Sequence, residues 1–251
     1  MRILVVGDSC IDKFVYGRCE RLNPEAPTPV FIPESEVTNP GMAANVLRNI
    51  KSLEMHEVYL LTNNEECEKT RFVEKNSNYI LLRVDSGEDK ISRIVVDDHD
   101  FTKWDVVVIS DYNKGFLSES DIEEISQNSK LTFMDTKKPL GPWASAVDWI
   151  KINLKEFNNP KHDTEFISQN LSKIIVTMGD KGTRLGDRIF TTDVVEVRDV
   201  VGAGDTFLSA LVLNYLKSGN INESIRVANI CATESVKHKG VVDLSKLKIS
   251  I

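Results

Sequence analysis

Short apolar runs recur along the chain and alternate with stretches of helical spacing. The runs are nearly continuous, are rich in β-branched residues, and lie at residues 3–6, 58–61, 106–110, 131–134, 150–152 and 174–177. Runs of this kind are typical of strands buried on both faces, as in parallel sheets. Helical spacing separates them at residues 43–52, 120–128 and 164–171. This rhythm predicts a doubly wound α/β core with right-handed crossovers.

Two stretches depart from this rhythm. Residues 12–37 are rich in proline, and residues 71–97 alternate between apolar and polar positions. Within the second stretch we predict a turn at 75–78 and strands at 71–73, 79–84 and 91–96. The alternation favours an antiparallel sheet with one solvated face. We expect the two stretches, about 12–37 and 71–97, to form a small β lid over the core; surface hairpins without a role are the alternative.

The last third of the chain has helical periodicity. Apolar residues recur at helical spacing over residues 202–216, and Gly219 with Asn220 ends that pattern. Asn222 is then the predicted cap of a second helix that runs to about Cys231. Both helices follow the apolar runs and complete the predicted α/β core.

The composition fits a globular protein and excludes several classes. The 251 residues are 41% hydrophobic and 27% charged, and the formal net charge is −7. This balance is unlike that of a disordered, collagenous or coiled-coil chain, and the acidic charge argues against a nucleic-acid or anionic-membrane surface. No run approaches the ~20 apolar residues that span a bilayer. The first residues predict a buried strand rather than a signal peptide, so we expect a cytoplasmic protein.

The strongest chemical signal is the glycine turn at the start of the predicted 202–216 helix, where residues 199–207 read DVVGAGDTF. Gly202, Ala203 and Gly204 let a ligand approach the backbone, and a helix N-terminus supplies free N–H groups with partial positive charge. Asp205 in the first turn can accept a proton from a hydroxyl while those N–H groups stabilise a transferring phosphoryl group. The alternative is an ordinary helix start with an acidic first-turn residue.

Other polar residues allow a structural and a functional interpretation. Asn153 and Glu156 are three apart and can share one side of a helix start, where a carboxylate can help to hold magnesium; a capping box is the alternative. Basic residues of the predicted lid and rim can bind a substrate phosphate or can be solvated charges. The best of them is Lys114, after a strand end, and the others are Arg71, Arg83 and Arg93.

Residues 199–210 resemble the C-terminal signature of the PfkB/ribokinase family of carbohydrate kinases, D-x-x-G-A-G-D-x-F/V-x-x-A. The resemblance implies a ribokinase-like three-layer α/β/α core, an ATP-dependent sugar kinase, Asp205 as the general base, and Gly202, Ala203 and Gly204 as the anion hole. Residues 7–12 resemble the first-strand region, in which Asp12 would bind substrate hydroxyls. Residues 40–46, PGMAANV, resemble the substrate segment PGGAANV, which places Gly41 and Asn45 at the sugar.

Further segments match the family in the same order. Residues 153–156 match N-x-x-E, which associates Asn153 and Glu156 with Mg²⁺ and phosphate. Residues 176–182 resemble the nucleotide-side strand and turn V-T-x-G-x-x-G, and the resemblance implies a site for ATP there. Asp199 and the Gly240 loop correspond to a monovalent-cation site in several relatives, so K⁺ is a possible ligand. The residues assigned in this way to the nucleotide are Thr177, Gly179, Gly182 and, near adenine, Asn229.

Within the family, the chain is most similar to bacterial D-glycero-D-manno-heptose-7-phosphate kinases. Residues 16–30, 110–115 (SDYNKG) and 134–137 (MDTK) resemble their motifs. That subfamily phosphorylates the anomeric hydroxyl of a seven-carbon sugar phosphate and is often fused to a nucleotidyltransferase domain. No such domain follows the last predicted helix, so we expect one kinase domain over 1–251. By resemblance we also expect a homodimer paired through the lid strands.

Three departures from the family pattern keep other functions open. Met42 replaces a glycine of the substrate segment and narrows the predicted sugar pocket. Val201 replaces a threonine before the glycine turn, and the chain between residues 60 and 71 is too short for an α/β unit that relatives have. Another PfkB-type kinase, for ribose, fructose or a similar sugar, is therefore one alternative, and a non-catalytic sugar- or nucleotide-binding homologue is another. A NAD-binding Rossmann enzyme is rejected, because no G-x-G-x-x-G follows the first strand.

Overall fold

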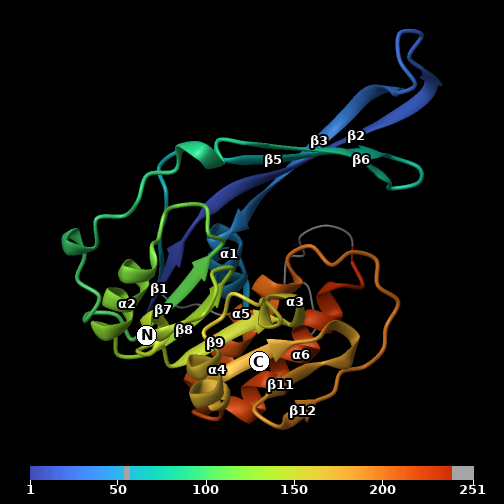
Figure 1. Ribbon diagram of the computed structural model, residues 1–251. Coiled ribbons are helices and arrows are strands. Elements are labelled where there is room, and N and C mark those ends of the chain that lie inside the picture. The colour runs from blue at the N-terminus through green and yellow to red at the C-terminus, as the bar shows by residue number, and fades with distance from the viewer. Residues whose placement is uncertain (54–56, 239–251) are drawn as a thin grey trace.

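The core of the protein is an eight-stranded sheet, seen in a computed structural model that describes residues 1–53 and 57–238 (Figure 1). Six neighbouring strands are parallel, and the last two join them antiparallel at one edge. In spatial order the strands are β12 (Arg188–Phe190), β11 (Thr183–Leu185), β10 (Ile174–Thr177), β9 (Trp149–Asn153), β8 (Thr132–Thr136), β7 (Val106–Asp111), β1 (Arg2–Gly7) and β4 (Glu57–Leu61). The predicted mainly parallel α/β sheet is thus confirmed.

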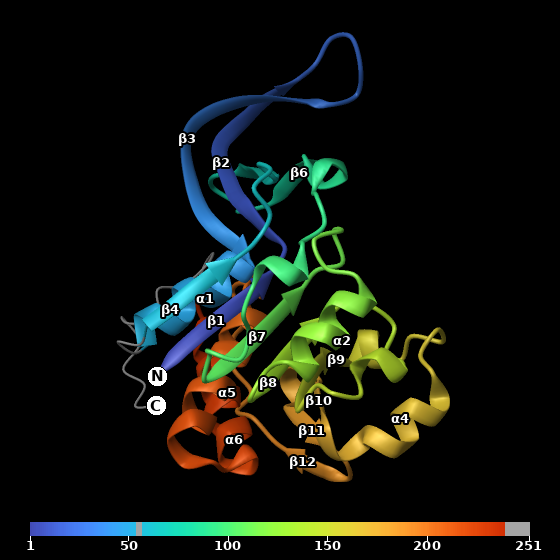
Figure 2. The same ribbon diagram turned by 90° about the vertical axis from the view of Figure 1, so that its left-hand side faces the viewer.

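Helices cover both faces of this sheet and make three layers (Figure 2). Ile3 and Val5 of β1 point to one face, whereas Leu4 and Val6 point to the other, which is why apolar runs without alternation predicted these strands. The first face packs against α1 (Ala43–Leu53), α5 (Ala203–Ser218) and α6 (Ile221–Ser235). The second packs against α2 (Glu119–Gln127), α4 (Thr164–Asn170) and the 3₁₀ turn η3 (Pro142–Ala144). The four-residue α3 (Leu154–Phe157) directly follows β9.

A second, four-stranded sheet projects from the core as a lid, with a long twisted hairpin at its outer end (Figure 1). Its order is β3 (Pro29–Met42), β2 (Ser9–Leu22), β5 (Glu68–Glu74) and β6 (Ile80–Ser86). The hairpins β2–β3 and β5–β6 are antiparallel, but β2 and β5 pair in parallel, so the sheet is mixed and not purely antiparallel as predicted. Only residues 62–67 separate β4, at the edge of the core sheet, from the lid strand β5.

Two local predictions from the sequence are wrong, and one hairpin was not predicted. Residues 91–96 do not form a lid strand; they cross the core, where Ile94 and Val96 are buried and Val95 is exposed, so their alternation reflects burial and not strand pairing. The cap of α6 is Asn220, whose side chain accepts from the backbone N–H groups of Asn222 and Glu223. The β11–β12 hairpin was not predicted, because three-residue strands carry too short a pattern.

None of the helices within residues 1–53 and 57–238 has both the length and the apolar character needed to cross a bilayer. The same residues contain no group of three or more His, Cys, Asp and Glu side chains arranged to hold a metal ion. The four cysteines are free thiols. The chemistry of the protein therefore has to be sought in its cavities and in the glycine turn.

Candidate active site

The glycine turn forms the start of α5, as the sequence predicts. Gly202 is the N-cap and has a φ of 76°, a left-handed conformation that a side chain rarely adopts. A Cβ atom on Gly204 would lie 3.0 Å from the Lys151 ammonium nitrogen, so the backbone and this cation are in close contact. The first N–H groups of α5 have no acceptor within the helix; the Ala203 N–H donates to the Val200 carbonyl at 3.3 Å, and the next N–H groups make the turn suited to an anion.

Asp205 lies in the first turn of α5 and is 4% exposed. Its Oδ2 accepts from Asn45 Nδ2 at 2.7 Å, and its Oδ1 accepts from the Tyr112 hydroxyl at 2.8 Å. Burial raises the pKa of Asp205 to about 6, against the lowering effect of these two hydrogen bonds. A carboxylate with such a pKa is ionised at neutral pH and is still basic enough to take a proton from a hydroxyl.

A cavity of about 400 Å³ opens above Asp205, between the core and the lid. The sequence predicted Asp12, Asn45 and Lys114 at the sugar, and all three line this cavity. Gly41 lies behind Asp12, since a Cβ atom on it would be 2.4 Å from Asp12 Oδ2. The remaining lining residues are Met42, Lys69, Arg71, Arg83, Tyr112, Lys137, Val201, Gly202 and Asp205. We call this space the charged cavity, because five of its lining side chains are cationic.

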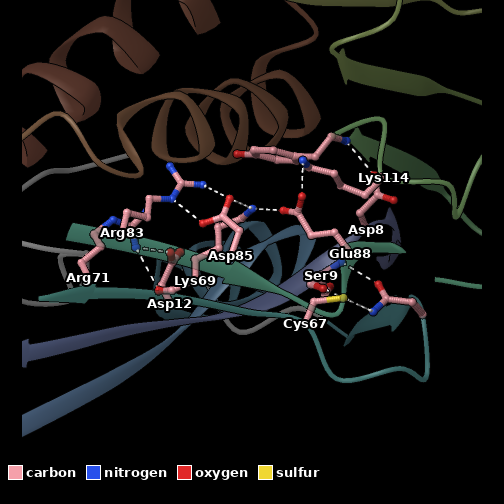
Figure 3. Close-up of polar contacts among 12 residues, drawn as sticks. Asp8, Ser9, Asp12, Cys67, Lys69, Arg71, Arg83, Asp85, Glu88 and Lys114 are labelled. Atoms are coloured by element: carbon pink, nitrogen blue, oxygen red, sulfur yellow. Dashed lines mark hydrogen bonds and ion pairs between the residues drawn. The ribbon is translucent and has the colours of Figure 1, made fainter. Parts of the chain in front are cut away.

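Carboxylates in and behind the lining hold most of these cations in place (Figure 3). Arg71 donates to Asp12 at 2.5 Å, and Arg83 makes two parallel bonds of 2.7 Å to Asp85. Glu88 forms ion pairs with both Lys69 and Lys114, and so connects the lid strand β5 to the loop after β7. Lys69 also lies 3.5 Å from Asp85. Asp85 and Glu88 do not line the cavity, so its lining carries five cations against the two carboxylates of Asp12 and Asp205 and is positive on balance.

Met42 is one of the departures from the family pattern, and it lies in the wall of the charged cavity. It is 4% exposed, packs near Cys10 and Cys67, and has a φ of 58°. A residue with a side chain pays about 1–2 kcal/mol of conformational free energy to adopt this left-handed backbone. Glycine, the residue of the family pattern at this position, avoids that cost. Arg93, by contrast, lies outside the cavity and pairs with Asp121 on α2 at 2.6 Å.

A second cavity, of about 300 Å³, lies on the other side of the glycine turn. The residues predicted for the nucleotide, Thr177, Gly179, Gly182 and Asn229, line it together with Ala203 and Gly204. We call it the apolar cavity. Half of its other side chains are aliphatic, namely Val194, Val195, Val197, Val200, Ala232 and Val236, and Asp180 and Asp193 are the acidic ones. The turn from Gly202 to Asp205 therefore separates two spaces of different chemistry.

Asn229 lines the apolar cavity, but its amide is occupied by the protein. Its Oδ1 accepts from the Thr183 hydroxyl at 2.6 Å, and its Nδ2 donates to the Phe190 carbonyl at 3.0 Å. Asn229 thus ties the hairpin strands β11 and β12 to α6. Its contribution to the cavity is to hold the wall in position.

Asn153 and Glu156 form the capping box that the sequence left as an alternative. Asn153 Oδ1 accepts from the Glu156 N–H at 2.9 Å, and Glu156 Oε2 accepts from the Asn153 N–H at 2.8 Å. The second Glu156 oxygen pairs with Lys137, which lines the charged cavity. Asp199 Oδ1 accepts from the Val201 N–H at 2.9 Å, just before the turn, whereas Gly240 lies outside the described residues.

No role is predicted from the sequence for Lys69, Tyr112, Lys137 or Lys151, although the first three line the same cavity as Asp205 and Lys151 lies beside Gly204. The signal for two of them lies in their positions: Tyr112 directly follows β7, and Lys137 directly follows β8. The carboxyl ends of neighbouring parallel strands meet at one edge of a sheet, which is where α/β proteins bind ligands. Lys69 could not be found in this way, because it belongs to the lid.

Comparison with known proteins identifies the family. A model of the pfkB family of carbohydrate kinases matches residues 105–247, more than half of the chain. The chain belongs to the pfkB family. It is thus an ATP-dependent carbohydrate kinase, and the kinases of this family use ATP with a divalent metal. The family match confirms the resemblance to carbohydrate kinases that the glycine turn indicates.

The chain is also similar to individual proteins over most of its length. It is 28% identical to the bifunctional protein HldE of Sulfurimonas denitrificans over 92% of this chain and 60% of that protein, and 29% identical to HldE of Helicobacter pylori over 95% and 63%. The kinase thus spans about three fifths of the length of these relatives. The first alignment extends over 284 positions, more than the 251 residues of this chain, so the relative contains residues that the kinase lacks.

Solved structures show that the fold is ribokinase-like. Ribokinase from Thermotoga maritima superposes with a TM-score of 0.74 at 15% identity, over 95% of this chain and 94% of that one. Arabidopsis thaliana ribokinase, solved in complex with ribose and ATP, superposes with a TM-score of 0.67 at 16% identity, over 98% and 99%. Phosphofructokinase-2 from Escherichia coli, solved in complex with potassium, gives a TM-score of 0.68 at 15% identity, over 98% and 97%.

Proposed function

We propose that this kinase phosphorylates the anomeric hydroxyl of a sugar phosphate, D-glycero-D-manno-heptose 7-phosphate, at the expense of ATP. The observation that carries the proposal is the charged cavity: five cations line the space that ends at Asp205. A neutral sugar is bound through its hydroxyl groups and does not require five cations. A phosphate, by contrast, is bound by charge-assisted hydrogen bonds from cationic side chains. The motifs shared with heptose-7-phosphate kinases and the similarity to HldE proteins support the same substrate.

In the proposed arrangement the sugar occupies the charged cavity and ATP the apolar cavity. Asp205 takes the proton of the acceptor hydroxyl, and the freed oxygen forms a bond to the γ-phosphorus. The bond from that phosphorus to the bridging oxygen of ATP breaks, and ADP leaves. The N–H groups at Gly202, Ala203 and Gly204 stabilise the charge of the phosphoryl group, because they lie between the two cavities.

The family resemblance assigns the metal to Glu156, whose two oxygens accept from the Asn153 N–H group and pair with Lys137, so this carboxylate would hold a metal only indirectly. Mg²⁺ binds through few carboxylates, with phosphates and waters as its other ligands. Glu156 and Asn153 would hold it indirectly, and the bound ion would neutralise charge on the phosphates of ATP. Asp199 remains the proposed ligand of a monovalent cation such as K⁺.

We further propose that residues 1–251 act as one kinase domain that forms a homodimer through the lid. The edge strands β3 and β6 each have one unpaired side among the described residues, and they carry exposed apolar side chains. Paired edges would cover those side chains. They are Ile32 and Val37 on β3, and Ile80, Leu82 and Val84 on β6. Light scattering that finds only a monomer at micromolar concentration would overturn the dimer.

The substrate is tested by measuring ADP formation with a panel of acceptors. The panel contains the heptose 7-phosphate, the unphosphorylated heptose, ribose, fructose and fructose 6-phosphate. We expect turnover with the heptose phosphate and at least ~10-fold lower kcat/KM with the unphosphorylated heptose, which lacks the charge-assisted bonds. Preference for a neutral sugar would favour a different sugar kinase. Nucleotide binding without turnover of any acceptor would favour a non-catalytic homologue.

A further inference from the structure

The MDTK segment at residues 134–137 is a motif whose chemistry the proposed function leaves unused. Asp135 is in β8 and Lys151 is its register partner in β9. Their side chains form an ion pair of 2.6 Å, and both residues are at most 4% exposed. Lys137 follows directly after β8 and lies 3.7 Å from the other oxygen of Asp135. Two ammonium groups are thus held by one buried carboxylate.

Lys151 lies against the glycine turn and lines neither cavity, whereas Lys137 borders the charged cavity. Lys151 Nζ is 3.0 Å from the position of a Cβ on Gly204, which lines the apolar cavity. Lys137 lines the charged cavity, where its Nζ lies 5.3 Å from the centre of the Tyr112 ring. Tyr112 in turn donates to Asp205. The ammonium of Lys137 therefore lies close to the line along which a phosphoryl group passes from ATP to the sugar.

The surroundings keep Lys137 charged. Its ammonium pairs with Glu156 and lies 3.7 Å from Asp135 Oδ1, and the Asp205 carboxylate adds a further negative charge nearby. Asp135 Oδ1 is buried and has no hydrogen-bond partner within the described residues, so it leaves an acceptor facing Lys137. A lysine held by carboxylates from three elements and bordering a cavity is a preorganised cation.

We propose that Lys137 is a further catalytic residue, whose ammonium contacts the γ-phosphoryl group of ATP during transfer, and that Asp135 and Lys151 are its positioning residues. This inference rests on the proposed function and deepens it. Phosphoryl transfer places negative charge on the equatorial oxygens, and a fixed cation beside them lowers the barrier. Lys137 neither gains nor loses a proton; the proton of the acceptor goes to Asp205, and the electron pair of the broken bond goes to ADP.

The test compares two nucleotides and needs no knowledge of the sugar. Binding of ADP and of the non-hydrolysable triphosphate AMP-PNP, each with Mg²⁺, is measured by calorimetry for the wild type and for Lys137→Met. A charged hydrogen bond to the γ-phosphate is worth about 10-fold or more in affinity. We expect that loss for AMP-PNP and less than a twofold change for ADP. Lys137→Arg should recover part of the loss, because it restores the charge.

Lys130→Met is the matched control. Lys130 has an exposed side chain, lies 3.9 Å from Asp105, and does not line either cavity. It should leave both affinities unchanged, and the melting temperatures of all variants show whether they are folded. Equal losses for ADP and AMP-PNP would indicate a structural role and overturn the inference, as would an unchanged AMP-PNP affinity. A wild type that binds neither nucleotide would instead contradict the proposed ATP site, and this inference with it.

Discussion

The charged cavity and the apolar cavity meet at one turn but are built in opposite ways. Ion pairs between distant segments hold the lining of the charged cavity, with Asp12, Lys69 and Lys114 contributed by two lid strands and a core loop. The apolar cavity is lined by residues 177–236 alone, mainly with aliphatic and small side chains. Charge selects a particular anionic acceptor, whereas an apolar slot with an N–H cradle accepts a base and its phosphates by shape.

The residues matched by the family model also divide the two cavities from each other. The matched residues, 105–247, contain the whole lining of the apolar cavity and the glycine turn. Half of the lining of the charged cavity precedes residue 105, including Asp12, Asn45 and Arg71. Under the proposed function, the part common to the family binds the nucleotide and performs the transfer, and the residues before 105 adapt the acceptor site. The predictions below test whether the two cavities can be altered separately.

The largest effect is expected at the shared turn. Asp205→Asn removes the general base, so turnover should fall at least ~100-fold. Nucleotide binding should persist, because the apolar cavity and its N–H groups are unchanged. Steady-state kinetics and calorimetric ADP binding measure the two effects.

Stability gives an independent check on the same variant. The pKa of Asp205 is raised to about 6 in the folded state, so the folded protein binds this proton more tightly than the unfolded chain does. The burial of Asp205 therefore costs stability increasingly as the pH rises from about 4 to about 6, and this cost is fully present at pH 7. Asp205→Asn should consequently melt no lower than the wild type at pH 7. Full activity in this variant would remove Asp205 from its proposed role.

The next effect should be confined to the charged cavity. Arg83→Met removes a lining cation whose side chain is partly exposed, and Asp85 keeps Lys69 as a partner. The KM for the phosphorylated acceptor should rise about 10-fold, as expected for the loss of a charge-assisted bond. The KM for ATP should not change.

Arg93→Met provides the matched control, since Arg93 pairs with Asp121 outside the cavity. It should change neither KM. If both arginine variants raised the acceptor KM equally, the cavity would not be the source of the selectivity.

Sequence and structure agree better for the apolar cavity than for the charged one, for a physical reason. The strand β10, the glycine turn and Asn229 carry local patterns, and they line one space because consecutive parallel strands end at the same edge. The charged cavity depends on where the lid folds back, and no local pattern encodes the Glu88 contacts to Lys69 and Lys114. The role of Tyr112 at Asp205 was missed for the same reason, since 93 residues separate them.

Tyr112 offers a smaller and more specific test. Tyr112→Phe removes the hydroxyl that donates to Asp205 and lowers its pKa, while the ring that packs under Lys137 remains. The pKa of Asp205 should therefore rise above about 6. The acid limb of kcat/KM against pH should move up by about 0.5 to 1 pH unit, the worth of one hydrogen bond. An acid limb that stays at the wild-type pH would mean that another group titrates there.

The smallest effect is expected for Met42→Gly, which widens the charged cavity at its base. Glycine relieves the left-handed backbone by about 1–2 kcal/mol, but the loss of a buried methionine side chain costs about 1.5–3 kcal/mol. The free energy of unfolding, measured in urea, should therefore fall by only about 1 kcal/mol. Because Met42 lines the charged cavity and not the apolar one, the acceptor KM should change while the ATP KM stays constant. An equal change in both would show that the turn couples the two cavities.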